Sequence, residues 1–278
     1  MLKKILLGAL ITLFATSAFA DNRTRSFLLN TLRSRAPLNV QINAVKVLNE
    51  EVGSSEAERA LLNIVKDKNA ASKLRQEALK SLVPISRSDT ITRTLTSLYS
   101  REQDLDVKVV LVKSLWLAAA SNNRIRRFLT SILLGDQEVR LQKAAAFALQ
   151  ATVNSSTAAA PLLKVIKNSS FDSELRVQAL KSLFFYNSSN VDRFLQQLAY
   201  NEGEDTSVRV ASLKLLVGYP ISSTKRRFLI NLALMTSDDT VRIAATDSLR
   251  VKLSQQDVRY FHLFKNPKTG DLRDPLLD

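Results

Sequence analysis

The sequence contains no cysteine, one histidine, one tryptophan, six glycines and six prolines in 278 residues. Without cysteine the chain can hold neither disulfides nor a thiolate metal site, so its stability must come from packing. The lone His262 excludes a His-rich metal centre, and the scattered glycines form no phosphate-binding loop. Neither G-x-S-x-G nor H-E-x-x-H occurs. The sequence therefore predicts no catalytic, cofactor-binding or metal site, and a protein that is not an enzyme.

The first twenty residues have the pattern of a secretory signal peptide. Lys3 and Lys4 supply a positive start, an apolar run covers 5–14, and Ala18-Phe19-Ala20 is a small-x-small cleavage site. The apolar run is short for a membrane span. We therefore expect cleavage near Ala20, no transmembrane segment in the mature chain, and a periplasmic or secreted protein.

The chain is strongly basic, with 40 Lys and Arg against 26 Asp and Glu and a net charge of +14. This balance favours anionic partners or surfaces, although part of the excess can serve only to keep an elongated protein soluble.

One helical phrase recurs along the chain. LRQEALKSL at 74–82 and LRVQALKSL at 175–183 agree at seven of nine positions. Their common pattern is apolar, basic, two variable residues, small, apolar, two variable residues and leucine. Its first residue, which we call the marker residue, recurs 33 or 34 residues apart. The marker residues are Val40, Leu74, Val107, Leu141, Leu175, Val208 and Val241.

A second series lies between the marker residues and has the same period. It sits in segments such as RRFLTSIL at 126–133 and RRFLINLA at 226–233. We call its members the first-helix leucines: Leu28, Leu61, Leu95, Leu129, Leu162, Leu195 and Leu229. Two series with one period predict a repeated pair of helices, seven times over. The fourth pair is irregular, because Asp136, Val139 and Arg140 fit a register two residues ahead of Leu141.

The repeat resembles the HEAT family. Asp238, Val241-Arg242 and the following Ala245 and Leu249 illustrate its pattern of Asp, Val-Arg-x-x-Ala and Leu on a second helix. The resemblance covers roughly residues 22–253, nearly all of the predicted mature chain. It implies an all-α fold, a right-handed α-α superhelix in which seven hairpins span 21–253 and the second helices line the concave side. We expect a C-terminal capping helix at 254–265, starting from Ser254 and Asp257, and an extended tail at 266–278.

A basic residue follows most marker residues, on the face that the helical period predicts to be buried. An unpaired buried cation is costly, so these residues need anions. The nearest candidates stand three residues before marker residues, where a carboxylate can cap the second helix. We predict a structural ion-pair series of Arg75, Lys108, Arg176, Arg209 and Arg242 with Asp104, Asp172, Asp205 and Asp238.

A row of lysines stands six residues after the marker residues, outside the predicted buried face. Five of the seven repeats have lysine there, and the other two have Phe147 and Asp247. On stacked repeats such residues form a spaced positive stripe on the concave face. The stripe is either a partner-binding surface or an ordinary solvated face. Its members are Lys46, Lys80, Lys113, Lys181 and Lys214.

Two further basic clusters lie near the starts of first helices, where the helix dipole disfavours cations. Such placement indicates either a surface that contacts an anionic partner or surface charge without a partner. The two clusters are Arg124, Arg126 and Arg127, and Lys225, Arg226 and Arg227.

The leading functional hypothesis is a non-catalytic exported scaffold that binds a protein segment or peptide on the concave face of the solenoid. The alternative is a basic solenoid that binds an anionic polymer or surface, such as nucleic acid, acidic glycan or anionic lipid headgroups. No cofactor is predicted, and the pattern carries no information on oligomeric state.

Overall fold

The computed structural model describes residues 23–34, 36–49, 54–152, 156–184, 186, 189–217 and 222–249. The predicted signal peptide, capping helix and tail lie outside these residues. The described chain is a succession of helices joined by short turns, and none of its helices is long and apolar enough to cross a membrane.

Seven helical pairs follow one another, as the two series predict. The first helices span 23–33, Ser55–Lys66 (α3), Asp89–Tyr99 (α5), Asn123–Leu134 (α8), Ser156–Lys167 (α10), Ser189–Tyr200 (α12) and Ser223–Met235 (α14). The second helices span Leu38–Leu48 (α2), Ser72–Ser81 (α4), Leu105–Ser114 (α6), Val139–Leu149 (α9), Ser173–Ser182 (α11), Thr206–Val217 (α13) and Asp239–Ser248 (α15). Three short helices, Val83–Ile85 (η2), Trp116–Ser121 (α7) and Gln150–Thr152 (η3), extend the second helices of pairs two to four.

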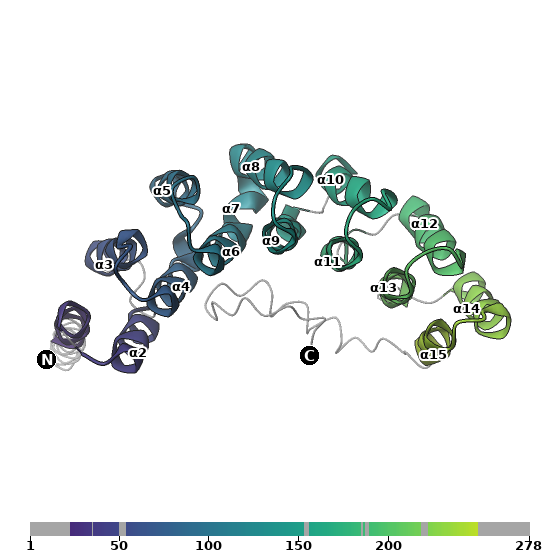
Figure 1. Ribbon diagram of the computed structural model, residues 1–278, viewed down its shortest axis with the longest axis horizontal. Coiled ribbons are helices and arrows are strands. Elements are labelled where there is room, and N and C mark those ends of the chain that lie inside the picture. The colour runs from purple at the N-terminus through teal and green to yellow at the C-terminus, as the bar shows by residue number, and fades with distance from the viewer. Residues whose placement is uncertain are drawn as a thin grey trace, which may run out of the picture.

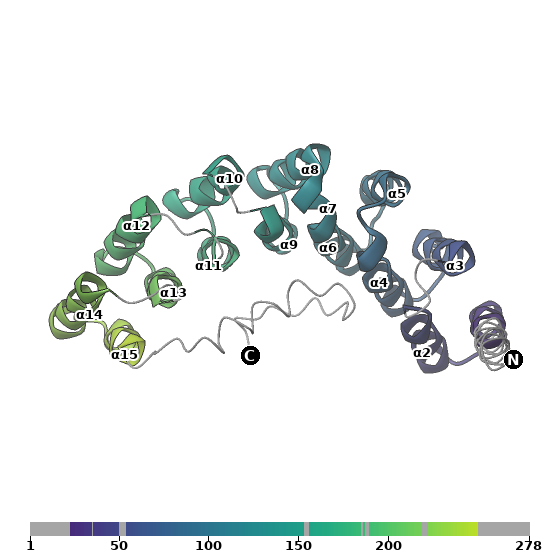
Figure 2. The same ribbon diagram turned by 180° about the vertical axis from the view of Figure 1, so that it is seen from behind.

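The pairs stack in chain order into an arc with two rows of helices (Figure 1). Each second helix from α4 to α13 contacts the second helix before it and the one after it, as well as its own first helix. Figures 1 and 2 show the first helices on the convex side and the second helices on the concave side. We therefore call them outer and inner helices. The all-α solenoid predicted from the sequence is confirmed.

The first-helix leucines and the marker residues form the core between the rows. The six leucines from Leu61 to Leu229 are fully buried, and the marker residues from Leu74 to Val241 are at most 6% exposed. One cluster of buried apolar side chains runs from Val45 in α2 to Leu216 in α13. Val40 is the exception among the marker residues, at 43% exposed. It belongs to the first of the described pairs, which among these residues has a stacking neighbour on one side only.

Short polar side chains begin many of these helices. Ser54, Asn122 and Ser222 each accept a hydrogen bond from a backbone N–H in the first turn of an outer helix. Asp104, Asp172 and Asp238 do the same for inner helices, since a carboxylate satisfies amides that have no partner within the helix.

The fourth pair keeps the register of the others. Its inner helix α9 begins at Val139, two residues before the marker Leu141, and Glu138 caps it. The other inner helices also begin two residues before their marker residues. Asp136, which fits the register two residues ahead of Leu141, therefore lies in the turn before α9. The buried face of the helix follows Leu141 and is not shifted.

Candidate functional site

Three buried arginines join the two helices of their own hairpin. Arg75, Arg176 and Arg209 stand one residue after a marker residue and are 2–3% exposed. The Nε–H of each donates, over 3.1 Å, to the backbone carbonyl ten residues earlier, at the end of the outer helix. These acceptors are Val65, Ile166 and Ala199. Each bond satisfies a terminal carbonyl that has no partner within its helix.

The same guanidinium groups reach the next hairpin. Arg75 forms a buried ion pair with Glu102. Arg176 pairs with Glu204 through two bonds of 2.6 Å. Each arginine therefore contacts two successive repeats, and we call these three groups the arginine clamps.

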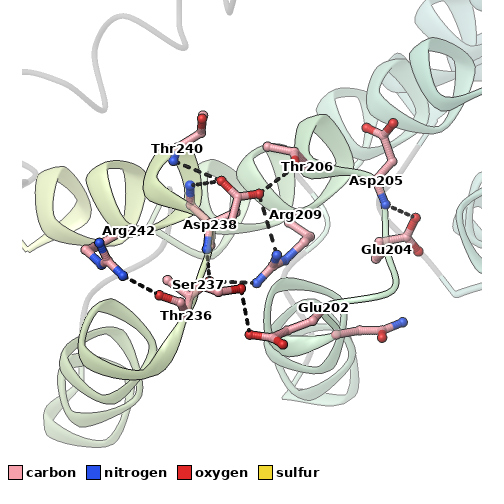
Figure 3. Close-up of polar contacts among 12 residues, drawn as sticks. Glu202, Glu204, Asp205, Thr206, Arg209, Thr236, Ser237, Asp238, Thr240 and Arg242 are labelled. Carbon is pink, nitrogen blue, oxygen red and sulfur yellow. Dashed lines mark hydrogen bonds and ion pairs between the residues drawn. The ribbon is translucent and has the colours of Figure 1, made fainter.

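The third clamp uses a hydroxyl and a carboxylate. Arg209 donates to Thr236 Oγ1 over 3.0 Å and lies 3.6 Å from Asp238 Oδ2. Figure 3 shows that Asp238 also accepts from Thr206 Oγ1 (2.6 Å) at the start of α13 and from backbone N–H groups at the start of α15. One carboxylate thus connects two neighbouring inner helices.

The clamp partners differ from the predicted aspartates in two cases of three. Glu102 and Glu204 precede the capping residues Asp104 and Asp205 by two residues and one residue. A capping carboxylate faces its own helix's first amides, so the residues just before it reach back toward the preceding hairpin. Among the partners of the three clamps, only Asp238 both caps a helix and pairs with a clamp arginine.

The remaining members of the predicted series have other contacts. Lys108 lies over the Tyr99 ring, 4.7 Å from its centroid. Arg242 pairs with Asp239 on its own helix and donates to the Thr236 carbonyl, with its side chain 46% exposed. In the fourth hairpin Gln142, which sequence reasoning passed over, takes the arginine's place and donates to the carbonyls of Leu133 and Gly135.

The clamps alter the ionisation of the acids that they hold. Burial by itself would raise the pKa of Glu102, but hydrogen bonds from Arg75 and from two backbone N–H groups outweigh it, so the pKa lies below its ordinary value. The hydrogen bond from Arg176 is the main reason why the pKa of Glu204 is lowered. The pKa of Asp238 is lowered first by the hydrogen bond from Thr206. These carboxylates are ionised and structural.

The inner face of the solenoid is the side of the inner helices that is turned away from the outer helices and from the neighbouring inner helices. Their residues two, three and six positions after the marker are mostly half-buried or exposed. Because outer and neighbouring inner helices cover the other sides, these positions open onto the inside of the arc. The predicted lysine row lies at the sixth of them. Lys46 and Lys214 are exposed, and Lys80, Lys113 and Lys181 are half-buried.

The lysine row has neighbours that the sequence analysis did not foresee. Lys113 lies over the Phe147 ring, 5.5 Å from its centroid, so the row continues across the fourth repeat through a cation–π contact. Lys80 pairs with Glu77 over 2.9 Å on its own helix. The lysine row therefore lies beside an aromatic ring and at least one acid.

Half-buried valines lie beside the lysines. Val109, Val177 and Val210 stand two residues after marker residues, and Val110 stands three after one. Each packs against the core with one side and leaves the other accessible. Sequence reasoning assigned the position two residues after the marker to the buried face and made no statement about Val110. Their recurrence two residues after the marker, at the edge of the buried face, was the available signal.

Acids balance part of the positive charge on this surface. Lys143 pairs with Glu174 over 2.7 Å, and Arg140 pairs with Asp106 over 2.5 Å, in both cases between neighbouring inner helices. The inner face therefore carries cations, acids and half-buried apolar side chains together.

Two members of the other basic clusters, the buried Lys225 and the half-buried Arg126, make polar contacts within the chain. Lys225 is 8% exposed and its Nζ is 2.8 Å from Asp192 on the preceding outer helix. Arg126 donates to the carbonyls of Ala119 and Ala120 at the end of α7. The interpretation of both clusters as partner-binding surfaces is corrected for these two residues, because their charges are already used within the chain. Arg124, Arg127, Arg226 and Arg227 are exposed.

No group of three or more potential metal ligands occurs in the described ranges. His262 lies outside them.

Comparisons with known proteins identify no family for this chain. No family model matches it, and no curated protein is detectably similar in sequence. Among solved structures it is similar to human deoxyhypusine hydroxylase in complex with glycerol, at 15% identity and a TM-score of 0.37. The match covers 84% of this chain and 97% of that one.

This likeness requires one correction. The prediction that the protein is not an enzyme came from missing motifs and from the helical-repeat architecture, yet a structure that it resembles is named as an enzyme. The prediction is withdrawn, and missing motifs do not by themselves exclude catalysis, since residues distant in sequence can assemble a reaction centre in space. The likeness is too weak to indicate an activity for this chain.

Proposed function

We propose that this protein binds a segment of another protein along the inner face of its solenoid, and that it does so outside the cytoplasm after loss of its signal peptide. The observation that carries the proposal is the pairing of a lysine with a half-buried valine four residues earlier on three inner helices, with Phe147 at the lysine position of the intervening α9. The pairs are Val109 with Lys113, Val177 with Lys181, and Val210 with Lys214. Export rests on the signal pattern at 1–20 alone.

The spacing of the inner helices suggests the form of the ligand. Packed helices lie roughly 8–10 Å apart. A segment in the polyproline II conformation rises about 3.1 Å per residue and has about three residues per turn, so one turn covers one helix spacing and brings every third side chain to the same side. A segment running along the arc would place every third side chain opposite the same position of successive repeats. The fitting ligand is an extended segment with an acidic residue at every third position and apolar residues between them.

The distribution of charge favours such a segment over an anionic polymer. Glu77, Asp106 and Glu174 each neutralise a cation on this surface. A polymer with uniform negative charge would meet these carboxylates as well as the lysines, whereas a segment with spaced acids can avoid them. The net charge of +14 nevertheless keeps the polymer as the second candidate.

Peptide binding tests the proposal directly. We expect the full chain to bind a fluorescent peptide with aspartate at every third position more tightly than a peptide of equal composition with aspartate at every fourth. The double variant Lys113→Glu/Lys181→Glu should weaken binding at least tenfold. Lys164→Glu, the same change on the exposed side of outer helix α10, should leave it unchanged.

Salt dependence separates the two candidates. Binding to a polyanion such as heparin or nucleic acid should fall steeply with salt, because each neutralised charge releases a counterion. Binding of a segment that also buries apolar groups should fall much less. Equal affinity for both peptides, together with a steep salt dependence for polyanions, would reject the proposed segment and support the polymer.

A further inference from the structure

A shallow hollow lies between the outer helices α12 and α14. Its volume is about 450 Å³, within the range of roughly 300–1,000 Å³ that small-ligand sites usually have. Both helices belong to the outer row (Figure 1), so the hollow is separate from the inner face that we propose as the protein-binding surface. Its lining residues are Arg193, Gln196, Gln197, Tyr200, Asn201 and Phe228.

Five of the lining residues form a single stripe on α12 and the residue after it. They follow one another at intervals of three, one, three and one residues, which is the spacing of one helical face. Tyr200 is 53% exposed, Arg193 and Gln197 are exposed, and Gln196 is half-buried. One side of the hollow therefore presents a guanidinium, three carboxamides and an accessible aromatic ring.

The polar groups of this stripe are available to a ligand. Within the part of the chain that the structure describes, the side chains of Arg193, Gln196 and Gln197 take part in no hydrogen bond or ion pair. Asn201 Oδ1 accepts a hydrogen bond from the Gly203 N–H over 3.1 Å, which leaves the NH₂ group of this amide as a donor. The hollow thus offers hydrogen-bonding groups that the fold itself does not use.

The equivalent positions of the preceding pair of outer helices carry different chemistry. Lys167 of α10 stands at the position of Tyr200, and Phe194 stands at the position of Phe228. The Lys167 Nζ lies 5.4 Å from the Phe194 ring centroid, so the lysine covers that ring. The positions of the guanidinium and of the first two carboxamides are held there by Ala160, Leu163 and Lys164. The polar stripe is therefore a feature of the junction between α12 and α14 and not a consequence of the repeat.

The lining divides into an apolar part and a polar part. The rings of Tyr200 and Phe228 supply apolar surface, and the carboxamides beside them both donate and accept hydrogen bonds. A sugar ring has the same division, because its faces carry C–H groups and its edge carries hydroxyls. A hydroxyl also donates and accepts, so a carboxamide can bind it in either sense.

Charge narrows the class of sugar. Arg193 is a cation, and none of the lining residues carries a carboxylate. A guanidinium binds a carboxylate through two parallel N–H···O bonds, which are stronger than its bonds to a neutral group. A sugar with a carboxylate substituent, such as a uronic acid unit, therefore suits this lining better than a neutral or a cationic sugar.

From these observations we infer that the hollow between α12 and α14 is a binding site for an acidic sugar unit of an oligosaccharide. The sugar ring packs on Tyr200, its hydroxyls bond the carboxamides of the stripe, and its carboxylate pairs with Arg193. This site does not depend on the proposed binding of a protein segment to the inner face.

An oligosaccharide array tests the inference with the full chain. The array carries oligosaccharides that contain uronic acid units, each with a neutral oligosaccharide of the same linkage. We expect at least one acidic oligosaccharide to bind, and to bind more tightly than its neutral counterpart. Absence of binding to every acidic oligosaccharide would overturn the inference, and so would equal binding of the acidic and neutral members.

Variants locate the binding within the molecule. Tyr200→Ala should weaken the affinity by about fivefold to tenfold, the loss expected from one aromatic contact, whereas Tyr200→Phe keeps the ring and should retain most of it. Arg193→Gln should reduce the affinity for the acidic oligosaccharide to that for its neutral counterpart. Leu234→Ala, at the position equivalent to Tyr200 on α14, is the matched control and should have no effect. The substituted side chains are exposed, so the melting temperatures should stay close to that of the native chain.

A variant of the inner face separates this site from the proposed protein-binding surface. Lys113→Glu/Lys181→Glu should leave the oligosaccharide affinity unchanged even where it abolishes peptide binding. If this double variant removes oligosaccharide binding while Tyr200→Ala and Arg193→Gln leave it intact, the sugar binds the inner face as an anionic polymer and the inference about the hollow is wrong.

Discussion

Arg176 and Glu204 form an ion pair with both side chains buried, and this pair joins the fifth hairpin to the sixth. Their side chains are 4% and 9% exposed, and the two bonds between them are 2.6 Å long. Arg176 also holds the end of its own outer helix through the Ile166 carbonyl. The stacking of neighbouring repeats therefore depends on polar contacts as well as on the apolar core.

Arg176→Ala should be strongly destabilising. It leaves the Glu204 carboxylate buried without its cation, a change that typically costs about 3–5 kcal/mol. Urea unfolding should show a lower midpoint than the native chain. Arg242→Ala removes a half-exposed guanidinium whose partner lies on the same helix, and should change the midpoint little. Equal effects of the two substitutions would contradict the clamp.

Stability should fall on the acid side of pH 4.5. The folded-state pKa values of Glu102 and Glu204 lie below the ordinary value of 4.5. Their contribution is therefore complete above 4.5 and is lost as the pH falls through the lower folded-state values. Thermal melts between pH 3 and pH 7 measure this loss. The variant Glu102→Gln/Glu204→Gln should have a lower Tm at neutral pH and a shallower decline below 4.5. A decline as steep as that of the native chain would assign the acid sensitivity to other groups.

Gly135 is required by a close backbone approach. A Cβ at this residue would lie 2.7 Å from the Ser131 carbonyl oxygen, which accepts a hydrogen bond from the Gly135 N–H. Gly135→Ala should therefore cost about 1–3 kcal/mol, as overpacked sites do. At Gly203 the nearest atom would be 3.5 Å away, so Gly203→Ala is the matched control and should be nearly neutral. Calorimetric melts of the two variants make the comparison.

Lys225 should matter for stability and not for ligand binding. Lys225→Ala removes the cation that faces the largely buried Asp192, and should cost up to about 3 kcal/mol. The exposed neighbour Arg227→Ala should cost little. If peptide or polyanion affinity falls for Lys225→Ala while its melting temperature is unchanged, the residue binds a partner and its structural assignment is wrong.

The sequence by itself determined the repeat and its buried positions. Leu129 belongs to the first-helix leucines and Leu175 to the marker residues, and both series have a period of 33 or 34 residues. The period arises because each hairpin must bury the same face against its neighbours, so every repeat carries apolar residues at the same positions. It also placed Lys113 and Lys181 at one equivalent position of the inner helices.

Only the tertiary structure decided which residues meet between hairpins. The partner of Arg75 is Glu102, 27 residues further on, and the choice between Glu102 and Asp104 depends on how two stacked helices orient the turn between them. The same packing buried Lys225 and left Arg227 exposed, although the two stand two residues apart in one basic cluster. Such contacts follow from the geometry of stacking, which periodicity in one chain does not specify.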